Sequence, residues 1–185
     1  PDQYIPGWVL NKAVRASTGR ILVFLNSDCT PVHDEWLEEL IAPLSQDASA
    51  VYGRQVARPD AQVLVRRDYE IAYPEAEGDT RTARLGDDSW KNFFSMASSA
   101  TKREVWEAFP FDPKIQYSED IYWARTLREA GHRVAYAPRS RVYHSHNYTL
   151  KQSFKRFRGE GKADARIFDQ NPVRQSLPLY VVVPY

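Results

Sequence analysis

Apolar and polar positions along this chain follow two periods, one typical of helices and one typical of strands. Apolar side chains that recur every three or four positions predict helices over residues 6–18, 33–45, 60–73, 103–109, 119–130 and 149–168. Short apolar runs predict strands over residues 20–25, 50–52, 91–101, 133–136 and 141–144. This alternation of the two element types indicates an α/β domain.

The run Arg20-Ile-Leu-Val-Phe-Leu25 is apolar at nearly every position, which is typical of a strand buried on both faces. It ends in the loop sequence Asn26-Ser-Asp-Cys-Thr-Pro31. Ligands of open α/β sheets bind at the carboxyl ends of strands, so Asp28 is placed to hold a cation or a substrate hydroxyl. The alternative is an aspartate that stabilises its own turn through the backbone.

Two stretches lack a periodic pattern. Residues 74–89 are rich in Gly, Asp, Glu and Thr, and we expect a surface loop that faces the substrate as a lid. Residues 170–185 contain three of the twelve prolines and predict an irregular segment, apart from a short strand-like stretch at 179–183.

The composition fits one ordinary domain or a large piece of one, since the chain has 185 residues, of which 43% are apolar. A mean hydropathy of −0.57 and the lack of a long apolar run exclude a transmembrane protein, and we expect no secretion leader. A single cysteine, Cys29, excludes a disulfide framework and a zinc site built from several thiolates.

The net charge of +1 gives the whole chain no electrostatic match to nucleic acid, but the charge is unevenly distributed. Residues 151–166 carry six basic and two acidic side chains, interleaved with Phe154 and Phe157. One interpretation is a solvated charged face with two core aromatic residues. The other is a clamp for a diphosphate or a contact with an anionic membrane surface.

Two further clusters could carry chemistry. Ser118 is suited to cap the helix that begins with Glu119 and Asp120, and this pair is either ordinary helix-start composition or a general base held by the helix end. His144 and His146 point to one side of an extended segment. Two imidazoles side by side either ligate a divalent metal or have no function.

Taken in order, these features resemble the inverting family 2 glycosyltransferases of the GT-A fold, and bacterial rhamnosyltransferase-like members in particular. The resemblance covers roughly residues 5–165. It is carried by Gly7, Asn11, Gly19, Phe24-Leu-Asn-Ser-Asp28, Trp36-Leu37, Tyr52-Gly-Arg-Gln55, Phe94-Ser95, Ser98-Ser-Ala100, Ser118-Glu-Asp120, Trp123-Ala124 and Tyr143-His-Ser-His-Asn-Tyr148. It implies a Rossmann-like, mixed but mostly parallel sheet flanked by helices.

The resemblance also implies roles for individual residues. Asp28 would ligate Mg²⁺ or Mn²⁺, with His144 or His146 completing the metal site. Asp120 would be the catalytic base, supported by Glu119. Weaker candidates for contacts with the donor or its phosphates are Asn26, Ser27 and Arg156, and for contacts with the acceptor or another substrate group, Arg54 and Gln55.

The implied substrates are a nucleotide-diphosphate sugar, with dTDP-rhamnose favoured, and a saccharide or lipid-linked acceptor used in the synthesis of surface polysaccharide. The implied location is the cytoplasm, at the inner face of the cell membrane, with a peripheral contact to it. Nucleic acid is not among the expected partners.

Two features depart from the family pattern. Asn26 replaces the first aspartate of the family's Asp-x-Asp motif, which predicts a less anionic metal site. Only 27 residues precede Asp28, too few for the family's opening nucleotide-binding units. We therefore expect residues 1–168 to be the C-terminal part of one GT-A domain, with residues 169–185 as an irregular extension.

These departures leave a second hypothesis, a non-catalytic remnant of the same fold that binds a nucleotide or a sugar. A nucleotidyltransferase is a third, which the lack of a glycine-rich phosphate loop disfavours.

Overall fold

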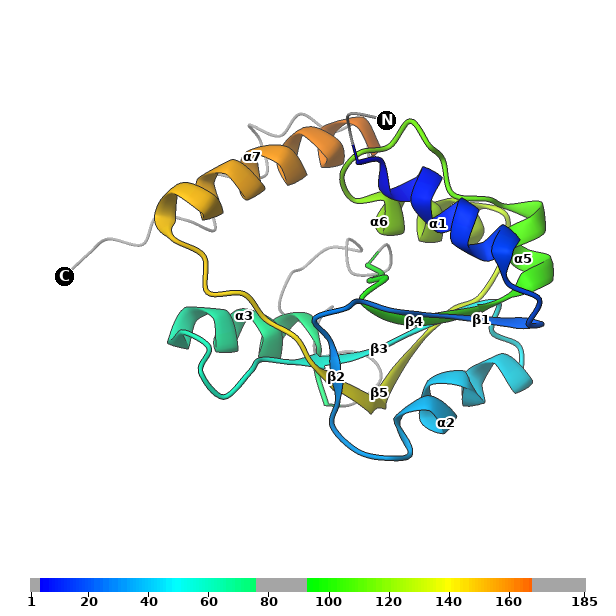
Figure 1. Ribbon diagram of the computed structural model, residues 1–185, viewed down its shortest axis with the longest axis horizontal. Helices are drawn as coiled ribbons and strands as arrows, with labels where there is room; N and C mark the ends of the chain where they lie inside the picture. The colour runs from blue at the N-terminus through cyan, green and yellow to red at the C-terminus, as the bar shows by residue number, and fades with distance from the viewer. Residues whose placement is uncertain (1–3, 76–92, 168–185) are drawn as a thin grey trace.

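The computed structural model describes residues 4–75 and 93–167, with the side chains of residues 164 and 166 excepted. These residues form a five-stranded sheet with helices on both faces (Figure 1). The strands are β1 (Ile21–Leu25), β2 (Thr30–Pro31), β3 (Ala50–Val56), β4 (Ser98–Lys102) and β5 (Val134–Tyr143). The helices are α1 (Pro6–Ala16), α2 (Trp36–Ile41) with the 3₁₀ turn η1 (Ala42–Ser45), α3 (Val63–Ala72), α5 (Arg103–Ala108), α6 (Glu119–Glu129) and α7 (Leu150–Ile167).

The sheet has the strand order β1-β4-β3-β5-β2 and is mixed, as expected. Parallel pairing is nevertheless the minority among the described strands, because only β3 and β5 pair in parallel. The other three pairings, β1 with β4, β3 with β4 and β2 with β5, are antiparallel. The strands β1 and β3 run in the same direction, but β4 lies between them and runs in the opposite direction. Two antiparallel pairings therefore stand where β1 and β3 could have formed one parallel pairing.

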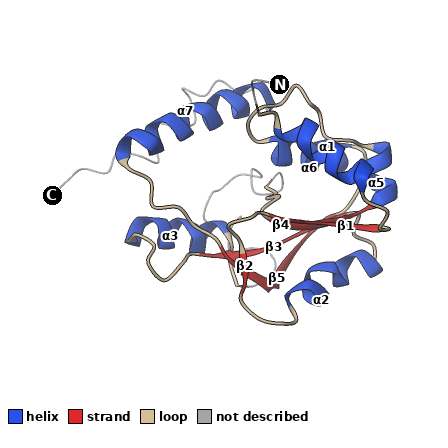
Figure 2. Cartoon of the chain, viewed as in Figure 1, coloured by secondary structure: helices blue, strands red, loops and turns tan. Residues whose placement is uncertain are grey.

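Alternating side chains of β3 pack on opposite faces of the sheet. Ala50 and Tyr52 pack into a cluster with α1, α5 and α6, while Val51 packs into a second cluster with α2 and η1. Figure 2 shows the resulting layers, with α1, α5 and α6 on one side of the strands and α2 on the other. The two apolar clusters hold the strand ends that carry the polar residues discussed below.

The expectation that the first strand is buried on both faces is wrong. Leu22 of β1 is buried, but Ile21, Val23 and Leu25 are each about two-fifths exposed. Their side chains alternate with Leu22 and point to the opposite face. Since β1 is the last strand of the described sheet, a continuous apolar run does not by itself secure burial on both sides.

The remaining elements differ from expectation mainly at their ends. The strands expected at 133–136 and 141–144 are one strand, β5, and the strand expected over 91–101 begins only at Ser98. The helix expected over 33–45 begins at Trp36 and tightens into η1. The predicted lid falls largely on residues 76–92, and the C-terminal extension falls on residues 168–185, both outside the described residues.

Two residues of α1 explain how this helix docks. A Cβ atom on Gly7 would lie 2.7 Å from the backbone oxygen of Asp112, so the helix can approach this segment only with glycine there. Asn11 is buried, and its amide donates to the carbonyl of Phe111 at 2.8 Å. Its Oδ1 accepts from the Trp106 indole at 2.9 Å and from the Phe111 backbone at 3.1 Å.

No helix in residues 4–75 and 93–167 is long and apolar enough to cross a membrane.

Candidate active site

Asp28 lies at the tip of a tight turn that follows β1. The Cys29 N–H donates to the carbonyl of Asn26 at 2.9 Å and closes the turn, and the Asn26 N–H donates to Ala97 at 3.0 Å. Asparagine is favoured at the first position of such turns, which is a local structural reason for the presence of asparagine at position 26. The Asp28 side chain is 44% exposed and available to a ligand.

His144 and His146 both face Asp28. The Asp28 Oδ2 atom lies 3.5 Å from Nε2 of His144 and 3.4 Å from Nε2 of His146. The two rings are perpendicular, with centroids 4.8 Å apart. The sheet register explains this meeting, because β2 begins two residues after Asp28 and pairs Thr30 with Tyr143. The pairing brings the residues before β2 next to those after β5.

The hydrogen bonds of His144 leave one ring nitrogen without a proton. Nδ1 lies 2.6 Å from Oε1 of Gln55, whose amide nitrogen in turn donates to Ser95 at 2.7 Å. Since Oε1 can only accept, Nδ1 carries the ring proton and Nε2 is a bare acceptor. Within the described part of the chain, Nε2 is buried with no hydrogen-bond partner. Burial lowers the pKa of His144, which keeps the ring neutral.

This arrangement fits a divalent cation. Two acceptors, Nε2 of His144 and Oδ2 of Asp28, face each other with no proton between them, and a cation would satisfy both. The Cys29 sulfur also lies close, since the donor atoms of Asp28, Cys29 and His144 are all within 4.8 Å of one another. Mg²⁺ and Mn²⁺ favour oxygen ligands, Mn²⁺ also accepts imidazole, and neither favours thiolate sulfur, so Asp28, His144 and His146 are the better candidates.

Glu119 and Asp120 form a second cluster at the start of α6. The Oδ2 atom of Asp120 accepts from the Met96 N–H at 3.1 Å, and Oδ1 accepts from the Ile121 N–H at 2.9 Å. These two bonds fix the orientation of the carboxylate. Burial raises the pKa of Asp120, and the two backbone donors partly offset that increase.

The expectation that the Ser118 side chain caps α6 is wrong. Ser118 stands at the N-cap position, but it has φ = 56° and makes no side-chain capping hydrogen bond. A capping serine has an extended backbone, which this left-handed conformation excludes. A positive φ is uncommon for serine, and it directly precedes the two carboxylates, so backbone strain is found at the candidate site.

The segment Ser95–Ala97 connects the two clusters. Ser95 accepts from Gln55, which holds His144, and the Met96 N–H binds Asp120. The Ala97 carbonyl accepts from Asn26 in the Asp28 turn. Three consecutive residues therefore fix the metal-site candidates and the candidate base in one frame.

The other predicted residues are distributed around these clusters. Arg156 donates to the Tyr148 hydroxyl at 2.7 Å, and the Tyr148 ring stacks on His146 with centroids 5.2 Å apart, so Arg156 joins the Asp28 side of the site. Ser27 is exposed in the Asp28 turn. Arg54 pairs with Glu75 at 3.1 Å, at the edge of residues 76–92.

Gln55 is only 3% exposed, and both ends of its amide are used inside the protein. Sequence reasoning also missed three neighbours of the site. Arg58 donates to the carbonyl of Asp28, and the Tyr69 hydroxyl lies 3.5 Å from Nδ1 of His144. Tyr148 is the third, as described above. Arg58 lies two residues after β3 and Tyr69 lies within α3, and only the fold brings them to Asp28 and His144.

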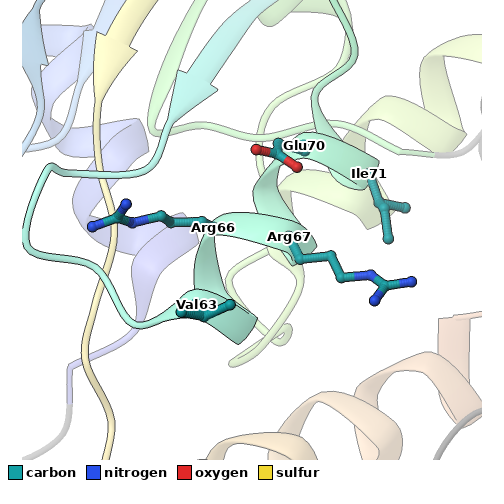
Figure 3. Close-up of a pocket in the computed structure, with 5 residues that line it drawn as sticks. All are labelled: Val63, Arg66, Arg67, Glu70 and Ile71. Carbon is teal, nitrogen blue, oxygen red and sulfur yellow. The ribbon is translucent and has the colours of Figure 1, made fainter.

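A hollow of about 460 Å³ lies along α3, outside both clusters. It is lined by Val63, Arg66, Arg67, Glu70 and Ile71, which share one side of the helix (Figure 3). The Arg66 side chain donates to the carbonyls of Ala61 and Pro59 and therefore holds the start of α3 in place. None of the candidate catalytic or metal-binding residues lines this hollow.

Glu119 makes the stability of the protein depend on pH. Burial and the charge of Asp120 raise its pKa from 4.5 to about 7. Between these values the folded chain binds more protons than the unfolded chain, so the free energy of unfolding falls as the pH rises from about 5 to 7. We expect Glu119→Gln to remove roughly 2 kcal/mol of this dependence.

Urea unfolding at a series of pH values tests this expectation, with Glu129→Gln at the exposed end of α6 as the matched control. Parallel pH curves for Glu119→Gln and the unsubstituted protein would contradict it.

The sequence is similar to known glycosyltransferases. Residues 6–161 match the family described as glycosyltransferase like family 2. The O-antigen chain rhamnosyltransferase WbaN of Salmonella anatum is 31% identical over 166 residues, which cover 85% of this chain and 51% of that protein. The O-antigen chain rhamnosyltransferase RfbN of Salmonella typhimurium is 29% identical, over 74% of this chain and 45% of that protein. The chain thus spans about half the length of these curated relatives.

Solved structures confirm the GT-A fold. The mannosyltransferase PcManGT of Pyrobaculum calidifontis, in complex with GDP-Man and Mn²⁺, has a TM-score of 0.63 at 20% identity, over 90% of this chain and 43% of that chain. Glucosyl-3-phosphoglycerate synthase of Mycobacterium tuberculosis, in complex with Mn²⁺, UDP-Glc and phosphoglyceric acid, has a TM-score of 0.56 at 21% identity. That match covers 92% of this chain and 57% of the synthase.

Proposed function

Since the chain belongs to glycosyltransferase-like family 2, we propose that it carries the active site of a metal-dependent, inverting glycosyltransferase. The donor is a nucleotide-diphosphate sugar, and the acceptor is a saccharide or a lipid-linked saccharide. Two relatives are named O-antigen chain rhamnosyltransferases, which supports dTDP-rhamnose as the donor and the cytosolic face of the cell membrane as the place of action.

The observation that carries this proposal is the bare, buried Nε2 atom of His144 opposite Asp28. Asp28, His144 and His146 would hold Mg²⁺ or Mn²⁺, which supplies positive charge against the diphosphate of the donor. Gln55 acts as a positioning residue, because its hydrogen bond to Nδ1 keeps the lone pair of Nε2 directed at Asp28.

The chain's own side chains perform the remaining steps. Asp120 accepts the proton of the acceptor hydroxyl while that oxygen forms a bond to the anomeric carbon. The bond between this carbon and the donor phosphate breaks on the opposite side, and its electron pair leaves with the nucleoside diphosphate. Arg58 donates to the Asp28 carbonyl and Arg156 to Tyr148 beside His146, and these two cations stabilise the negative charge of the leaving group.

Manganese binding tests the metal site directly. We expect Asp28→Asn to weaken Mn²⁺ binding by at least about tenfold, since it removes a charged ligand. Gln55→Leu should also weaken it, because His144 loses the partner that sets its tautomer. Electron paramagnetic resonance of free Mn²⁺, recorded while Mn²⁺ is titrated into each protein, measures both effects.

Asp34→Asn is the matched control, because Asp34 is an exposed aspartate six residues along the chain. Equal Mn²⁺ affinity in the protein with and without Asp28→Asn would overturn the metal assignment.

Release of dTDP from dTDP-rhamnose, compared with the release of nucleotide from UDP-glucose and GDP-mannose, tests the donor. The intact mass of the purified protein is measured first against 21.4 kDa, so that the length of the assayed protein is known. Mn²⁺-independent nucleotide binding without turnover, in a protein as long as its relatives, would favour the non-catalytic alternative.

A further inference from the structure

The first half of α7 exposes large apolar side chains. Leu150 is 92% exposed and Phe154 is 73% exposed, and Phe157 on the same side is 56% exposed. With 3.6 residues per turn, these three positions fall within about 60° of the helix circumference. The structure therefore excludes the interpretation of Phe154 as a core residue. Such a contiguous apolar strip on a surface helix marks an interaction site.

A basic strip runs alongside the apolar one. Lys151, Lys155, Arg158 and Lys162 are all exposed and fall within about 60° of one another, next to the apolar strip. The opposite side of α7 faces the protein, where Arg156 pairs with Glu160 and Gly159 approaches the Tyr117 ring. The helix thus has an inward side, an outward apolar strip and an outward basic strip.

The start of α3 carries a second pair of exposed apolar side chains. Val63 and Leu64 are 80% and 73% exposed. They directly follow Gln62, whose N–H donates to Asn147 at 3.0 Å, and Asn147 precedes Leu150 by three residues. The segments that lead into α3 and α7 are therefore in contact. Arg67 lies on the side of α3 that lines the hollow beside Val63 (Figure 3).

We propose that α7 and the start of α3 form a docking surface for an anionic phospholipid membrane. An interfacial helix combines an apolar strip, which enters the boundary between headgroups and acyl chains, with lysine and arginine residues that bind anionic headgroups. Both strips are present on α7, and the positive charge of the basic strip is complementary to the negative charge of such a membrane surface. The inference goes beyond the transfer reaction, because none of its residues belongs to the Asp28 or Asp120 clusters.

Co-sedimentation with vesicles tests the proposal without any transfer reaction. We expect the chain to bind vesicles of phosphatidylcholine mixed with phosphatidylglycerol, and to bind pure phosphatidylcholine far less. Leu150→Ser and Phe154→Ser should each lower the partition coefficient roughly tenfold, since each removes an apolar side chain from the lipid. Lys155→Gln should lower the partition coefficient about fivefold, and added salt should also lower it.

Two matched controls accompany these variants. Leu37→Ser removes a part-exposed leucine from α2, which lies on the other face of the sheet (Figure 1). Lys114→Gln removes an exposed lysine from the loop before α6. Both should bind the mixed vesicles as the unsubstituted chain does. A chain that stays in the supernatant with both lipids would overturn the proposal and indicate a protein partner instead. Equal binding by Phe154→Ser would also overturn it.

Discussion

Replacing Asp120 with asparagine is expected to lower the turnover number of sugar transfer by roughly 10²–10⁴-fold, the contribution of a general base. Asparagine cannot accept the proton of the acceptor hydroxyl, whereas its Oδ1 atom can still accept one of the two backbone hydrogen bonds that hold Asp120. The proposed donor site is the Asp28 cluster, which this substitution leaves intact, so the donor affinity should change little. Steady-state kinetics with varied donor separates kcat from KM.

Two controls accompany this substitution. Thermal unfolding shows whether Asp120→Asn is folded. The loss of one backbone hydrogen bond should cost about 1–3 kcal/mol, partly offset because burial disfavours the charged form of Asp120. Glu129→Gln, at the far end of the same helix, is the matched variant and should retain full kcat. An Asp120→Asn protein that transfers sugar at the rate of the unsubstituted protein would exclude Asp120 as the base.

Replacing Asn11 with alanine is expected to destabilise the fold by about 3 kcal/mol or more. The substitution removes three hydrogen bonds at once and leaves the Trp106 indole and both backbone groups of Phe111 without their partner. A buried polar group deprived of its partner costs about 1–3 kcal/mol. Urea unfolding followed by circular dichroism measures the difference.

Lys12→Ala is the control for this substitution, because Lys12 is the next residue on α1 and its ammonium lies over the exposed ring of Trp8. It should cost less than 1 kcal/mol. Similar losses for Asn11→Ala and Lys12→Ala would mean that helix composition, rather than the buried contacts, governs the docking of α1.

The helices could be predicted from the sequence because their signals are local. The helix that follows Ser118 ends just before Gly131, whose φ of +84° is the left-handed conformation that glycine adopts readily after a helix. The strand β5 was predicted as two pieces because Pro138 and its neighbours interrupt the apolar pattern. In the structure β5 continues through a register shift opposite Gly53 and Arg54. Ser140 stabilises this irregularity by donating to the carbonyl of Trp36, a contact that no local pattern shows.

The candidate site also contains residues that the sequence could identify and residues that only the fold reveals. Asp28 and the two histidines stood out because their residue types are those of metal ligands. Gln55 acts through its contact with His144, which arises only when β3 and β5 pair, and Tyr148 stacks on His146 from two residues further along the chain. Residue type alone therefore identifies groups that could touch substrate, but it cannot identify the groups that orient them.

The segment Ser95–Ala97 shows what kind of sequence change the site can absorb. Met96 and Ala97 hold Asp120 and Asn26 through backbone atoms, so substituting their side chains leaves these two bonds chemically possible. Inserting or deleting a single residue here would instead displace the candidate base relative to the metal ligands. In this part of the protein, the number of residues is under stronger constraint than their identity.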